Sequence, residues 1–187
     1  GHAPWVMRGN LDGKPRMLNF ALAPGIWASF DTQQASLYQL WQGDILFQGP
    51  AYNHLHGVQP ISTGASFIHQ TAAVTWSLEV DGQQLPATVQ YLGHEYGSGQ
   101  ATAGFRFELS AGEQRLQLLN TPELLERAGQ QVFQQRIVAD PAKPGYRAVM
   151  HSADGSLTAP ATIEAILATP VAIVQQEVSS SASDTEL

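Results

Sequence analysis

Apolar residues recur along the chain in short alternating stretches that are separated by turn residues. From Val74 to Val80 every second residue is apolar and the residues between are polar. This is the pattern of a β-strand with one buried face. The pair Asp81-Gly82 follows directly and is typical of a tight hairpin turn. The sequence therefore predicts strands joined by short turns.

Ten or more short strands are expected from such stretches. They are Met17–Ala23, Gly25–Phe30, Ser36–Trp41, Val74–Val80, Phe105–Leu109, Arg115–Leu119, Val132–Val138, Tyr146–His151, Ile163–Ala168 and Val171–Val174. Strands at this spacing, among 17 glycines and 11 prolines, favour an all-β fold. We expect an antiparallel β-sandwich, in its ordinary or an extended super-sandwich form, with at most one short helix.

The short helix is predicted at Thr121–Gly129. Thr121 has the side chain of an N-cap, Pro122 suits the first helical position, and Gly129 suits the C-terminal stop.

The composition excludes several classes of function. Charged residues are 13% of the chain, against about 25% in an average protein, and glutamine, with 19 residues, supplies much of the polarity. The formal net charge of −7 argues against a nucleic-acid partner. No apolar run approaches the 18 residues that a membrane span needs, so no span is expected. The absence of cysteine excludes disulfides and covalent haem attachment within this chain.

The ends of the chain differ from its middle. Residues 1–3 resemble a tag or cleavage scar. Residues 175–187 are rich in serine and acidic residues and have little apolar surface to bury, which indicates an interdomain linker or a tail. We expect one β-sandwich domain over residues 4–174, cut from a longer protein.

A histidine pair is the first candidate site. His54 and His56 form an H-x-H, which on a strand would project two metal ligands from one face. A third ligand would come from His69, His94, Asp31 or Asp44. Structural or surface histidines are the commoner explanation, so His54 and His56 are weak metal candidates.

The charged residues near the N-terminus form a second candidate site. Arg8, Asp12 and Arg16 bracket a turn, and Asp31 ends a predicted strand. They could brace the turn as ion pairs, or they could recognise a carboxylate or sugar hydroxyls, because guanidinium and carboxylate groups form bidentate hydrogen bonds.

Aromatic residues and one long loop complete the candidates. Trp41 and Tyr52 could stack against a sugar ring, although tryptophan in a strand is more often a core residue. The segment Gly49–Gly64 reads as a long loop and would line a site if one exists. His56 lies in this loop and is the best candidate for a general acid or base.

Several segments together resemble a known domain. They are Pro4–Leu18, Phe30-Asp31-Thr32, Ser36–Gly43, His56–Pro60, Tyr91–Tyr96 and Thr121-Pro122-Glu123. Over roughly residues 4–140 they resemble an uncharacterised domain of large bacterial extracytoplasmic proteins, which accompanies c-type cytochrome domains and sugar-dehydrogenase-like propellers.

The resemblance implies a context rather than an activity. The parent protein would be periplasmic or secreted, with haem only in a neighbouring domain and no cofactor in this one. Its role would lie in sugar oxidation or polysaccharide breakdown. Arg8, Asp12, Arg16, Asp31, Trp41 and His56 fall at typical positions of the domain, and the segment at Thr121 is extended in it.

Three functions follow as hypotheses. The first is a non-catalytic accessory domain that binds carbohydrate or docks to the cytochrome c domain, and coplanar exposed aromatics would support sugar binding. The second is a mutarotase-like or hydrolase-like enzyme that uses His56 with Asp12 or Asp31. The third is a structural spacer.

Overall fold

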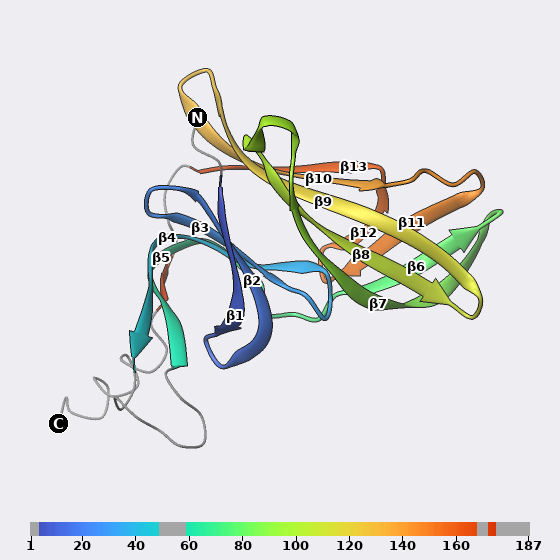
Figure 1. The fold of residues 1–187 in the computed structure, drawn as a ribbon, viewed down its shortest axis with the longest axis horizontal. Coiled ribbons are helices and arrows are strands. Elements are labelled where there is room, and N and C mark those ends of the chain that lie inside the picture. Colours follow the sequence, from blue (N-terminus) through green and yellow to red (C-terminus); the bar gives the residue numbers. More distant parts are fainter. Residues whose placement is uncertain (1–3, 49–58, 168–171, 175–187) are drawn as a thin grey trace.

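The computed structural model describes residues 4–48, 59–167 and 172–174. These residues form two antiparallel sheets that pack face to face (Figure 1), so the predicted all-β sandwich is confirmed. The first sheet follows the order β1 (Trp5–Leu11), β2 (Lys14–Ala23), β3 (Ile26–Asp31), β4 (Ser36–Gln48), β5 (Gln59–His69) and β14 (Ala172–Val174). Its first five strands are neighbours in sequence as well as in space, as expected for successive hairpins.

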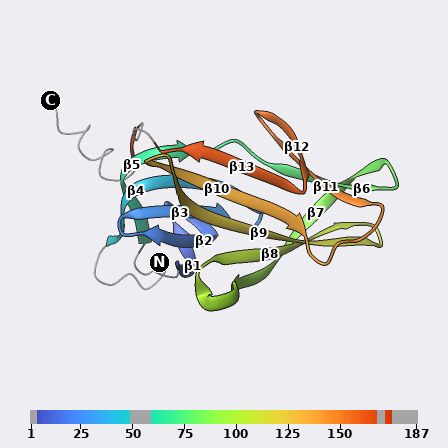
Figure 2. The same cartoon turned by 90° about the horizontal axis from the view of Figure 1, so that it is seen from above.

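The second sheet is larger and strongly curled. Its order is β12 (Gly155–Ala159), β11 (Tyr146–Ser152), β6 (Thr75–Val80), β7 (Gln83–Tyr96), β8 (Ala103–Ala111), β9 (Gln114–Arg127), β10 (Gln130–Ala139) and β13 (Ala161–Ile166). The two edge strands, β12 and β13, are separated only by Pro160, so the sheet nearly closes into a barrel. Figure 2 shows this sheet reaching well beyond the smaller one.

The main core lies between the sheets and is rich in phenylalanine. Phe20 and Phe30 of the first sheet contact Phe105 of the second, with ring centroids 6.4 and 5.0 Å from it. All three side chains are fully buried. The alternation seen in the sequence explains this placement, because residues 105, 107 and 109 of β8 face the core while residues 106 and 108 face outward.

A second, smaller core covers the opposite face of the first sheet. It contains Leu11, Met17, Tyr38 and Trp41, with the partly buried Trp27 packed against it. This face is also where several polar side chains of the first sheet are buried. The first sheet therefore has no simple solvent-facing side.

The predicted helix is wrong. Thr121–Arg127 belongs to strand β9, where Thr121 pairs with Arg136 and Pro122 with Gln135 of β10. Gly129, assigned as a helix stop, has φ 79° in the turn between the two strands. Pairing along the whole hairpin outweighs the local helix signal, and the only helical turn in the described residues is the short 3-10 segment Ser98–Gln100.

The predicted loop over Gly49–Gly64 is wrong for residues 59–64, and residues 49–58 lie outside the described residues. Residues 59–64 belong to β5, where Ile61 pairs with Leu46 and Ser62 with Ile45 of β4.

No helix in the described part of the chain is long and apolar enough to cross a membrane.

Candidate functional site

Three adjoining hollows meet around Gln70, the residue that follows β5. All three are lined by Gln70, and the largest has a volume of about 260 Å³. It takes residues from the start of β4 and from β10, β11, β12 and β13. We call the three hollows together the Gln70 groove.

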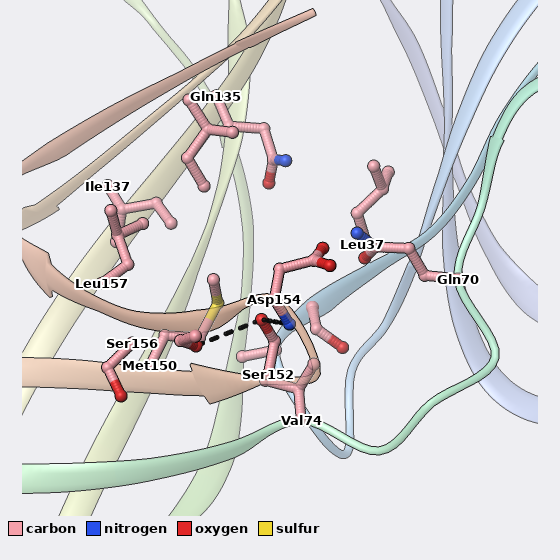
Figure 3. A pocket seen from close by; sticks show the side chains of 14 residues that line it. Leu37, Gln70, Val74, Gln135, Ile137, Met150, Ser152, Asp154, Ser156 and Leu157 are labelled. Atoms are coloured by element: carbon pink, nitrogen blue, oxygen red, sulfur yellow. Dashed lines mark hydrogen bonds between the residues drawn. The ribbon is translucent and has the colours of Figure 1, made fainter.

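The groove has an apolar floor and a polar rim (Figure 3). The apolar residues that line the largest hollow, here called its floor, are Leu37, Val74, Ile137, Met150, Leu157 and Ile163. Gln70, Ser152, Asp154 and Ser156 form the rim, and the buried Gln135 adds an amide group within the hollow. In Figure 3 the Gln135 amide and the Asp154 carboxylate both extend into the space above the floor.

Several of the rim groups are available to a ligand. Within the described residues, the side chains of Gln70 and Asp154 form no hydrogen bond or ion pair. The oxygen of the Gln135 amide accepts a hydrogen bond of 3.1 Å from Asn120, which leaves its nitrogen as a donor. Amide and carboxylate groups above an apolar floor can bind the hydroxyls of a polyhydroxylated ring while its C–H face rests on the floor.

The turn between β3 and β4 supports one wall of the groove. Its residues are fixed by hydrogen bonds, from the Gln33 amide to Asp31 Oδ1 at 2.9 Å and from the Val74 amide to Gln34 Oε1 at 2.8 Å. The Trp76 indole also donates to the Gln34 carbonyl at 2.7 Å. The first bond lies within the turn, and the two bonds to Gln34 join the turn to Val74 and to Trp76 of β6 in the second sheet, so this wall is held by the fold itself.

A separate pocket forms where β1 and β2 face β7. It is lined by Arg8, Arg16, Thr32, Gln33, Val89, Gln90 and Tyr91, and its volume is about 370 Å³. The Arg8 guanidinium carbon lies 4.5 Å from the centre of the Tyr91 ring, a cation–π contact. Two predicted ligand-binding residues, Arg8 and Arg16, are therefore brought together here, and we call this the Arg8–Arg16 pocket.

The charge in this pocket is entirely positive. None of the residues that line it is acidic, and neither arginine forms an ion pair within the described part of the chain. Burial raises the pKa of the Tyr91 hydroxyl more than Arg8 lowers it, so the tyrosine stays neutral. The pocket can therefore bind an anion.

Asp12 lies apart from both sites and has a structural role. Its carboxylate accepts hydrogen bonds from the Tyr38 hydroxyl at 2.8 Å, the Ser62 amide at 2.7 Å and the Ser62 hydroxyl at 2.5 Å. Burial, and then the charge and hydrogen bond of Asp12, raise the pKa of Tyr38 far above its ordinary value. Because Asp12 is occupied by these donors, it joins the turn between β1 and β2 to strands β4 and β5 rather than facing a substrate.

Asp31 is also engaged within the fold. It is largely buried, lies 3.9 Å from the Lys14 ammonium group, and accepts the hydrogen bond from Gln33. It borders the third hollow of the Gln70 groove together with Lys14 and Gln34. Of the two candidate catalytic carboxylates, only Asp31 is therefore near a hollow.

The tryptophans do not form a flat binding platform. Trp41 is fully buried and stacks on Trp27 with the ring planes 14° apart, and Trp76 is also buried. Trp5 is 57% exposed but meets Trp27 edge-on at 71°. Burial leaves Trp41 no free ring face for a ligand, so its predicted contact role has no support here.

The remaining candidates from the sequence are only partly described. Tyr52, His54 and His56 lie outside the described residues. Among the described residues, no group of three histidine, aspartate or glutamate side chains is arranged to hold a metal ion. The described residues include His69, His94, Asp31 and Asp44, the predicted third ligands.

The sequence analysis missed a histidine beside the Gln70 groove. The two ring nitrogens of His151 lie 2.8 Å from the hydroxyls of Ser77 and Ser156, and Ser156 lines the groove. A serine–histidine pair can act in acyl transfer when a carboxylate orients the ring. Here the second nitrogen meets another hydroxyl, so the arrangement links β6, β11 and β12 and lacks the orienting carboxylate.

Comparison of the chain with models of known families, with curated proteins and with solved structures found no match. The Gln70 groove and the Arg8–Arg16 pocket are therefore the features of the structure that bear on function.

Proposed function

We propose that the chain is a non-catalytic accessory domain that binds carbohydrate in the Gln70 groove. Its parent would be a secreted or periplasmic multidomain redox protein linked to polysaccharide breakdown or sugar oxidation. The sequence resemblance supports this context, and haem would belong to a neighbouring domain.

One observation carries the binding proposal. The Gln70 groove combines apolar lining residues with a carboxylate that is free within the described residues and with amide groups that still offer hydrogen bonds, and one of its walls is held by cross-sheet hydrogen bonds. A rigid site loses little conformational freedom when a ligand binds, which favours affinity. Neutral hydrogen-bonding groups also suit neutral hydroxyls, in keeping with a chain that is only 13% charged.

The engagement of the acidic candidates supports a binding role over catalysis. Asp12 is saturated by donors from Tyr38 and Ser62, and Asp31 is held by Lys14 and by the turn. A general acid or base needs a carboxylate that can reach the substrate. The enzyme hypothesis with His56 would therefore have to proceed without Asp12.

Calorimetric titration with defined oligosaccharides tests the proposal. Hexamers of cellulose, xylan, mannan, chitin and starch serve as neutral ligands. The double variant Gln70→Ala with Asp154→Asn should weaken binding by about tenfold or more, equal to about 1.4 kcal/mol. Gln84→Ala is the matched control, because Gln84 is exposed on β7 and lines neither the Gln70 groove nor the Arg8–Arg16 pocket.

Two results would count against the proposal. Equal loss of affinity in the double variant and the control would place the ligand elsewhere. Absence of binding to every neutral and acidic saccharide, with binding to the isolated cytochrome c domain instead, would favour the docking function.

A further inference from the structure

Two arginines in an acidic protein gather in one pocket without a carboxylate to neutralise them. The chain has 9 basic and 16 acidic residues. Five basic residues form ion pairs in the described part of the chain: Lys14, Arg106, Arg115, Arg127 and Arg147. Acidic residues outnumber basic ones, yet Arg8 and Arg16 have no acidic partner there although both line one pocket.

The backbone holds both arginines in place. Arg8 projects from β1 on the same face as the core residue Val6, and its guanidinium rests on the Tyr91 ring of the other sheet. Arg16 has φ 57°, and its carbonyl accepts hydrogen bonds from the Thr32 hydroxyl at 2.5 Å and the Thr32 amide at 3.3 Å. The aromatic contact fixes the Arg8 guanidinium, the two hydrogen bonds fix the Arg16 backbone, and both residues line the same pocket.

The remaining lining residues are those expected around a sugar. Thr32, Gln33 and Gln90 provide neutral hydrogen-bonding groups beside the two charges. The volume of about 370 Å³ falls in the range of ligand sites, which starts near 300 Å³. A carboxylate is planar and accepts paired hydrogen bonds from guanidinium groups, while hydroxyls suit the amides.

The pocket also shares a structural element with the Gln70 groove. The turn between β3 and β4 contributes Thr32 and Gln33 to the Arg8–Arg16 pocket, and its next residues, Gln34 and Ala35, line hollows of the groove. The same turn therefore contributes residues to both sites.

We propose that the Arg8–Arg16 pocket binds the carboxylate of a uronic acid unit, so that the natural ligand is an acidic oligosaccharide. This inference rests on the proposed carbohydrate-binding function and narrows its ligand class.

The test compares each acid with its own neutral ester. Tetramers of galacturonate, mannuronate and guluronate, and the methyl ester of each, are titrated into the whole chain by calorimetry. At least one acid should bind about tenfold or more tightly than its ester, because hydrogen bonds to a charged group are stronger than those to a neutral one. The preference should shrink as sodium chloride is added.

Charge-matched variants locate the site. Arg8→Gln and Arg16→Gln should each abolish the preference for the acid over the ester. Arg136→Gln should leave the preference for the acid unchanged. Arg136 is exposed on β10 and, like Arg8 and Arg16, lacks an ion pair in the described residues, but it lines neither the Gln70 groove nor the Arg8–Arg16 pocket. Circular dichroism of each variant checks that the fold is retained.

The outcomes separate this inference from the proposed function. Equal binding of acids and esters, unaffected by Arg8→Gln or Arg16→Gln, would overturn the inference and leave the carbohydrate function intact. Displacement of the tetramers by equimolar sodium acetate would show a general anion site and overturn the sugar assignment. No binding of any acid, ester or neutral hexamer would overturn the proposed function itself.

Discussion

Replacing Asp12 by alanine should destabilise the protein more than replacing any other charged residue that is accessible at the surface. The Asp12 carboxylate accepts three hydrogen bonds, one from Tyr38 and two from Ser62. Tyr38 is 6% exposed and Ser62 is fully buried, so water cannot take over these bonds without rearrangement.

The cost follows from the groups left without an acceptor. The Tyr38 hydroxyl and the Ser62 amide lose their acceptor, whereas the Ser62 hydroxyl can still donate to Gln39 Oε1, 3.2 Å away. Each orphaned buried donor costs about 1–2 kcal/mol, which gives about 2–4 kcal/mol for the two. Alanine at φ 51° adds about 1 kcal/mol, since that conformation is unfavourable for a residue with a Cβ and no local side-chain hydrogen bond. The expected loss is therefore about 3–5 kcal/mol in the free energy of unfolding.

Urea unfolding followed by tryptophan fluorescence and circular dichroism measures this loss. If Asp12→Ala proves too unstable to study, Tyr38→Phe removes only one of the bonds and should cost about 1.5–3 kcal/mol. Asp154→Ala is the control, since Asp154 is exposed and its carboxylate is unbonded in the described residues, and it should change stability by less than about 0.5 kcal/mol. If Asp12→Ala lowers the free energy of unfolding by an amount within about 1 kcal/mol of the control, with a similar dependence of that free energy on urea concentration, the structural role of Asp12 is wrong.

Two further predictions concern pH and backbone geometry. The pKa of Tyr38 is raised in the folded state, so its contribution to stability is complete below the ordinary tyrosine pKa of about 10 and declines as the pH rises above it. Urea unfolding between pH 8 and 11 should therefore show that the difference in unfolding free energy between wild type and Tyr38→Phe narrows above pH 10. A difference that stays constant over this range would contradict the prediction. Gly43→Ala should cost more than about 3 kcal/mol in the same assay, because its Cβ would lie 1.8 Å from the Thr63 carbonyl oxygen. Gly9→Ala should be nearly neutral, since nothing lies within 4 Å of the added carbon, and equal effects of the two substitutions would count against this geometry.

The sequence predicted the core strands well because their burial is one-sided. The alternation in Val74–Val80 and Phe105–Leu109 matches β6 and β8 to within a few residues. Strand β7 is harder to recognise, because it is an amphipathic strand whose partly buried face mixes Leu85 with Ala87 and Gly93. The helix at Thr121 failed because its signals are local, whereas the pairing of β9 with β10 that decides its conformation is not.

The candidate site was predictable only in part. Arg8 and Arg16 attract notice because charge is scarce in this chain, and the structure places both in one pocket. Tyr91 lies 75 positions or more from them, so no local pattern could connect it. Gln70 and Gln135 went unnoticed because glutamine is so abundant that a single one carries no positional information.

Nuclear magnetic resonance of the 15N-labelled chain tests the central claim most directly. Backbone amide shifts are followed while the neutral hexamers and the uronate tetramers are added one at a time. Saturable chemical-shift changes are expected at Gln70, Gln135 and Asp154, and also at Thr32 and Gln33 for the acidic tetramers. Shifts gathered instead around the exposed Trp5, or no shifts at millimolar saccharide, would contradict this claim.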